Sequence, residues 1–187
     1  MVDRKSLIDA AIENGAVKAE VILQEQIVTD KAFWDICASN GCGRFGKYWT
    51  CPPAIGKPDE LLAELKGYSH AMLYQTIGDI EDSFDIEGMI EVGHNHEEVS
   101  CRIHAAAKTL FAGEKFLHLS SGGCYLCERC AKQDDLPCRF PDEALAPMEG
   151  YCIDVYRTSA NTDLKYINGT NTVTYFGILL FTETENA

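Results

Sequence analysis

The sequence predicts an α/β fold, with α+β as the alternative: a single layered domain over residues 1–187 that has a mixed sheet and cysteine-rich loops. Segments with the period of a strand alternate with segments with the period of a helix along most of the chain. After the turn Asn168-Gly169 the end of the chain has the pattern of a hairpin, which would add antiparallel pairing to the sheet. No repeat or linker divides the 187 residues, a length that suits one domain.

A helix and a strand are predicted first. The helix covers 3–14, because Asp3 can cap it, an apolar stripe follows at helical spacing, and Gly15 can end it. From Val17 to Leu23 apolar residues then alternate with other residues, which is typical of a half-buried strand.

The next elements flank a long loop. A short helix is predicted over 30–38, and a loop with three glycines and two prolines over 39–55. Pro58 suits the first turn of a second helix, which Gly67 ends. The apolar run over 69–77 predicts a buried strand.

The second half of the chain continues the alternation. Residues 79–93 are acidic and irregular, and the best-marked helix is predicted over 96–112. A strand over 115–119 leads into a cysteine-rich loop, and Pro147 is expected to open a further helix. The most strand-like run of the end of the chain covers 172–181.

The strongest chemical signal is a run of cysteines after two glycines. Two successive C-x2-C steps place three thiols on one tight loop, and a fourth cysteine follows after seven more residues. Bacterial ferredoxins open with this spacing, and the longer gap would let the fourth thiolate complete the same [4Fe–4S] cluster. Glycine lets backbone amides approach and hydrogen-bond the cluster sulfides. The predicted metal ligands are Cys124, Cys127, Cys130 and Cys138, with Gly122 and Gly123 as cofactor-binding residues.

Zinc is the alternative occupant of the same four cysteines. Four thiolates also hold structural zinc, usually as two C-x2-C pairs from separate loops. The third cysteine of the run is surplus to one such pair, so the spacing favours an iron–sulfur cluster over zinc.

A second group of cysteines lies in the loop over 39–55 and just before it. Cys37, Cys42 and Cys51 are separated by four and eight residues, with glycines between them and two prolines after the last. Three thiolates could hold a second metal if Cys152 or Cys101 joined them, and Cys152 completes the candidate set. The alternative is that these are structural thiols packed beside the first loop.

Charge and cysteine content limit the partners. A formal net charge of −13 disfavours binding to nucleic acid, which needs cationic side chains to displace counterions. The start of the chain has no signal-peptide pattern, and the longest apolar run is too short to span a membrane. Nine cysteines without an export signal predict a cytoplasmic, reducing setting, where clustered thiols bind metals or act in catalysis.

The histidines give weaker signals. His94 and His96 are predicted to belong to the polar first turn of a helix, and His104 to lie off its apolar stripe. His118 is predicted to be a hydrogen-bonded histidine of the strand over 115–119.

With these residues in view, the chain resembles the family catalogued as domain of unknown function 2284, described as predicted metal-binding proteins. Phe45 stands where tyrosine is expected and Cys152 where glycine is expected, so Cys152 is an extra thiol of this chain. The resemblance implies cysteine-bound metal and a cytoplasmic, often anaerobic, setting, and it implies no particular reaction. The matching segments are Cys42 to Pro53, Gly122 to Cys130, Pro137 to Pro141 and Ala146 to Val155.

Three functions are therefore compared. The first is electron transfer to a protein redox partner through an iron–sulfur cluster, with the acidic surface selecting the partner. The second is a structural or interaction module stapled by zinc. The third is a metal-dependent enzyme in which an open metal position or a free thiolate, Cys37 or Cys152, acts on a small substrate.

Overall fold

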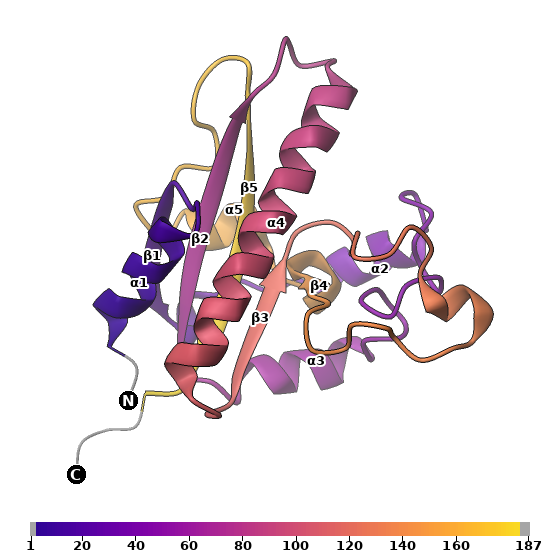
Figure 1. Cartoon of the computed structure of the whole chain (residues 1–187), viewed down its shortest axis with the longest axis horizontal. Helices are drawn as coiled ribbons and strands as arrows, with labels where there is room; N and C mark the ends of the chain where they lie inside the picture. Colours follow the sequence, from indigo (N-terminus) through magenta and orange to yellow (C-terminus); the bar gives the residue numbers. More distant parts are fainter. Residues whose placement is uncertain (1–2, 184–187) are drawn as a thin grey trace.

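The computed structural model describes residues 3–183 and contains one five-stranded mixed sheet, which confirms the predicted α/β fold. Helices cover both of its faces, and the cysteine-rich loops lie together beyond one side of it (Figure 1). The strand order across the sheet is β1 (Lys18–Leu23), β2 (His70–Asp79), β5 (Thr172–Phe181), β3 (Phe116–Ser120) and β4 (Ala146–Pro147).

The last strand is central rather than part of a terminal hairpin, so that prediction was wrong. β5 lies between β2 and β3 and is antiparallel to both. From Phe176 to Phe181, five of six side chains are apolar and buried, pointing alternately to the two faces of the sheet. A strand that is apolar on both faces is most stable in the middle of a sheet, where both faces are covered.

One face of the sheet is covered by α1 (Arg4–Glu13) and α4 (Ile86–Phe111). Asp3 caps α1 as predicted, because its carboxylate accepts a hydrogen bond from the backbone N–H of Ser6 at 3.1 Å. The core of this layer joins these helices to the sheet and includes Leu7, Met72, Val99, Ile103, Phe111 and Leu179.

The opposite face carries α3 (Pro58–Leu65) and a short 3-10 helix, η3 (Met148–Tyr151). Pro58 stands at the start of α3, as predicted. The short helix α2 (Ala32–Ala38) packs on η3. The core of this layer includes Leu61, Leu65, Leu73, Met148, Tyr151 and Ile178.

Two segments differ from the prediction. α4 begins ten residues earlier than the predicted 96–112, because the Asp85 side chain caps it by accepting from the N–H of Gly88 at 2.8 Å. The glycines and acidic residues of this first part hide the helical pattern in the sequence. After Pro147, the expected continuous helix is broken at Cys152, whose φ of 63° is left-handed, so η3 and α5 (Val155–Ser159) are separate.

His96 lies in the interior rather than in the polar first turn of a helix. It is 0% exposed, its Nε2–H donates to the backbone carbonyl of Phe176 at 3.0 Å, and its Nδ1 accepts from Thr76 at 2.8 Å. His118 is hydrogen-bonded as predicted, through Nε2 to the Tyr74 hydroxyl at 2.9 Å. His96 thus ties α4 to β2 and β5, and His118 joins β3 to the Tyr74 hydroxyl of β2.

Burial lowers the pKa of His96 to about 4 from an ordinary 6.5, because the charged ring would lose its hydration. The unfolded chain therefore binds a proton at His96 below about pH 6.5 that the folded chain does not. We therefore expect the free energy of unfolding to fall by about 3 kcal/mol at this residue as the pH falls from 6.5 to 4. The ring-proton signal of His96 in an NMR titration should have its midpoint near pH 4, and a midpoint near 6.5 would contradict the buried, neutral ring.

Candidate metal centre

The run of cysteines lies in the loop over residues 121–145, which leaves β3 and returns in β4. Its two ends are fixed side by side, because Leu119 and Ser120 pair in parallel with Ala146 and Pro147. Between them the chain forms only one short 3-10 helix, η2 (Ala131–Asp134). The sheet thus closes the loop, and cysteines that are fourteen positions apart in sequence can face one another.

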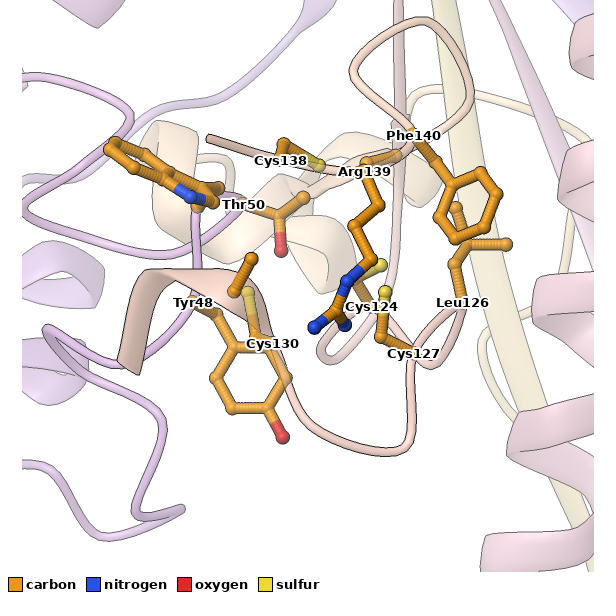
Figure 2. A pocket seen from close by; sticks show the side chains of 12 residues that line it. Tyr48, Thr50, Cys124, Leu126, Cys127, Cys130, Cys138, Arg139 and Phe140 are labelled. Atoms are coloured by element: carbon orange, nitrogen blue, oxygen red, sulfur yellow. The ribbon is translucent and has the colours of Figure 1, made fainter. Parts of the chain in front are cut away.

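The four predicted metal ligands line one pocket, together with Trp49 and Thr50 of the loop over 39–55 (Figure 2). Each of the four thiols is partly buried and none takes part in a disulfide. Cys138 comes from the far end of the loop, after η2, and faces the same pocket as the first three. The four residues brought together are Cys124, Cys127, Cys130 and Cys138.

The space among these thiols is narrow. The cavity volume is about 10 Å³, which is about the room needed for one water molecule. Arg139 extends its side chain among the cysteines (Figure 2), and its Nη1 donates to the backbone carbonyl of Arg129 at 3.0 Å. Arg139, an exposed residue, therefore lies in the space that a metal centre would occupy.

The donor set has the chemistry of a soft-metal site. Thiolates select zinc, copper(I) and iron–sulfur clusters among biological metals. Burial raises the pKa of the Cys124 thiol to about 12, so without metal this group is protonated at neutral pH. A metal must displace that proton, which couples its binding to pH. Within residues 3–183 no three Cys, His, Asp or Glu side chains converge closely enough to hold a single ion.

The loop over 39–55 is fastened to the cysteine run. The Trp49 indole N–H donates to the backbone carbonyl of Leu136 at 2.9 Å, and the Lys132 ammonium lies 4.4 Å from the centroid of the Trp49 ring. Arg44 lies over the Tyr125 ring at 4.3 Å and donates a long hydrogen bond of 3.4 Å to the carbonyl of Cys124. The two cysteine-bearing loops therefore form one structural unit.

The three cysteines of the second group line a separate cavity of about 500 Å³. Cys37 lies in the last turn of α2, Cys42 is exposed and Cys51 is buried. Gly122 and Gly123, which were expected to serve the first cluster, line this second cavity instead of the first pocket.

Cys152 is fully buried and is not among the residues that line the second cavity. Its backbone carbonyl accepts from the N–H of Asp30 at 2.8 Å, which ties it to the segment that leads into α2. Cys101 lies on α4 and borders a third, open cavity of about 760 Å³. Neither cysteine lines the cavity of the three thiols, and the role of either as a fourth ligand stays a prediction.

Two charged residues, Glu97 and Arg44, lie beside the cysteine run. Glu97 accepts a hydrogen bond from the backbone N–H of Tyr125 at 2.8 Å, while its other carboxylate oxygen is buried without a hydrogen-bond partner. Burial raises the pKa of Glu97, and the nearby Arg44 guanidinium opposes that rise. Only the fold brings α4 and the loop over 39–55 to the same side of the cysteine run.

The fold and the clustered thiols define a cysteine-rich α/β protein with the donor groups of a metal-binding protein. The chain belongs to the family of predicted metal-binding proteins designated DUF2284, whose model matches residues 20–181. No curated protein and no solved structure matches the chain. This match confirms the resemblance seen in the sequence. The family description names neither a metal nor a reaction, so both must be inferred from the chemistry of the site.

Gly123 offers a test of how the two loops are joined. A Cβ at this position would overlap the Arg44 guanidinium, whereas a Cβ at Gly41 would meet nothing within 4 Å. We expect Gly123→Ala to displace Arg44 from the Tyr125 ring and to lower the free energy of unfolding by about 1–2 kcal/mol. Gly41→Ala is the matched control and should change it little.

A double-mutant cycle measured by chemical denaturation separates this cause from a general backbone effect. In an Arg44→Ala background, Gly123→Ala should lose most of its effect, because the side chain that it displaces is gone. An equal loss of stability in both backgrounds would show that Arg44 is not the reason for glycine at position 123.

Proposed function

We propose that this protein binds a [4Fe–4S] cluster through Cys124, Cys127, Cys130 and Cys138 and transfers single electrons to a protein partner. The observation that carries the proposal is the shared pocket of these four thiols, three from one tight turn and one from the far end of the loop. When bound, a cluster of this kind exchanges one electron at a potential set by its charge, its hydrogen bonds and its exposure to solvent.

The spacing of the four cysteines supports a cluster over a single zinc ion. Zinc bound by four cysteines usually uses two C-x2-C pairs from separate loops. Here Cys124, Cys127 and Cys130 follow one another on one loop, so the third is surplus to one such pair. Two successive C-x2-C steps are typical of ligands to an iron–sulfur cluster.

The residues around the cysteine run would tune the potential. Arg44 and Arg139 place positive charge beside a group of thiolates and would favour the reduced, more negative state of a cluster. The net charge of −13 would favour a redox partner with a basic docking surface and would speed its association at low salt. We place the protein in the cytoplasm, because all nine cysteines are free thiols. No helix within residues 3–183 has the length and apolar character needed to cross a membrane.

A metal-dependent enzyme is the second candidate, and one observation favours it. The open cavity of about 760 Å³ beside the cysteine run is bordered by Cys124 and Cys127 and by polar residues of α4. His94 and Glu97 stand on its wall, and the Glu97 carboxyl has its pKa raised by burial. A small substrate in this cavity would lie against the cluster-binding thiols.

Substitution of single cysteines tests the proposed cluster. Cys127→Ser should remove the iron, the acid-labile sulfide and the brown visible absorption from protein purified without oxygen. Cys101→Ser is the matched control, because Cys101 is also a partly buried free thiol but lies outside the four-cysteine pocket. It should retain all three signals. A colourless wild-type protein that contains only zinc would rule out the cluster and leave the zinc module.

A further inference from the structure

A second group of ligand-type side chains lines the cavity next to the four-cysteine pocket. Cys37, Cys42 and Cys51 lie on its wall, and the carboxylate-bearing Glu149 lies there with them. We propose that this cavity holds a second iron–sulfur cluster, bound by these three cysteine thiolates and, at its fourth metal, by the carboxylate of Glu149. The assignment does not depend on the first cluster, because the two ligand sets share no residue.

Topology brings Glu149 to this place. β4 pairs with β3, and η3 begins directly after it, so Glu149 stands two residues beyond the parallel pair that closes the cysteine loop. α2 packs on η3 from the other side and supplies Cys37. The carboxylate and the thiol therefore reach the same cavity from two elements that are in contact.

The wall of the cavity places the Glu149 carboxyl together with the three thiols. None of the ion pairs found within residues 3–183 includes Glu149. Its carboxylate is therefore available to a metal at this place.

This concentration of acidic ligands needs positive charge, and a metal centre would supply it. Arg44 is the one cationic side chain on the wall of the cavity within the described chain, and it is already engaged with two tyrosine rings. Three thiols and a half-buried carboxyl group around one cavity would repel one another once ionised. An iron–sulfur core offsets that repulsion and makes the ionised forms the stable ones.

The volume and walls of the cavity favour a cluster over one ion. Its volume of about 500 Å³ exceeds what a single bound ion needs, and no three of its ligand-type side chains converge on one point in the described chain. Gly122 and Gly123 form part of the wall, so backbone there can approach a cluster without side chains in between. The glycines before the cysteine run would thus serve the neighbouring centre.

Glu149, rather than Cys152, is assigned to the fourth position. Cys152 is 0% exposed, lies outside the cavity wall and follows η3 in a left-handed conformation. A carboxylate is a harder ligand than a thiolate, so the iron beside Glu149 would differ from its three thiolate-bound neighbours. This difference gives the proposal a spectroscopic signature.

The two centres would be close neighbours. Thr50 lines the first pocket and the next residue, Cys51, lines the second; likewise Cys124 lines the first and Gly123 the second. Electrons could therefore pass between the two sites without a large gap of protein.

The test counts iron and sulfide in the full chain after anaerobic purification and reconstitution. Wild type should hold about eight iron atoms per chain, about four for each cluster. Cys42→Ser, at an exposed position, should remove about half of the iron, and Cys127→Ser should remove the other half. Circular dichroism checks that each variant is folded.

Mössbauer spectra test the fourth ligand. Wild type should show one iron subsite that differs from the thiolate-bound iron, Glu149→Ala should change that subsite, and Cys152→Ala should leave it unchanged. A change with Cys152→Ala and none with Glu149→Ala would overturn the assignment to Glu149.

The iron count separates the two proposals from each other. About four iron atoms that Cys127→Ser removes and Cys42→Ser spares would overturn the second cluster and uphold the first. About four iron atoms with the opposite dependence would uphold the second cluster and overturn the proposed function. Zinc in place of iron in the wild type would overturn both.

Discussion

The short parallel pairing of β3 with β4 is the constraint on which the cysteine-rich part of the molecule depends. Two residue pairs hold both ends of the loop over 121–145, so the loop cannot open without breaking the edge of the sheet. Closing a long loop carries an entropic penalty that an isolated peptide would pay in full. Here the sheet has already brought the ends together, and the same pairing sets the position of Glu149 just beyond β4.

A buried polar network holds β3 against β2 and α4 at this edge of the sheet. Tyr74 of β2 donates to the Ser100 hydroxyl on α4 at 2.7 Å, and Ser120 at the end of β3 donates to the same hydroxyl at 3.0 Å. His118 completes the network through the Tyr74 hydroxyl. Each of these groups is fully or almost fully buried, so loss of one partner would leave another unsatisfied inside the core. The last residue of β3 is therefore fixed immediately before the metal-binding loop begins.

Much of the fold could be predicted from periodicity, because most helices and strands have one clear apolar pattern. The predictions were wrong where neighbours in space decide. β5 pairs with strands that are far away in sequence, and its burial on both faces, not the turn before it, sets its central place. The early start of α4 depends on one side-chain cap, at Asp85, among residues of poor helix propensity.

The residues of the candidate site also fall into two groups: those that sequence spacing brings together and those that only the fold brings together. Local spacing was enough to group Cys124, Cys127, Cys130 and Cys138, because loop residues close in sequence are close in space. It was not enough for Glu149 or Arg44, which reach the site through β4 and through the loop over 39–55. Neither residue belongs to a motif that names a metal ligand, so their roles follow only from the packing of these elements.

The joining of the two loops has a consequence for how the protein folds. Trp49 and Arg44 contact the cysteine run directly, so the loop over 39–55 cannot settle independently of the loop over 121–145. Without metal, buried thiols such as Cys124 and Cys37 are protonated, and the contacts of Trp49 and Arg44 join the two loops. With metal, each thiolate bond ties chain segments that the apolar core does not reach, and binding free energy becomes folding free energy. The sheet is thus a preformed scaffold that holds the two cysteine-rich loops at its side, and metal bound to their thiols would add to the order of these loops.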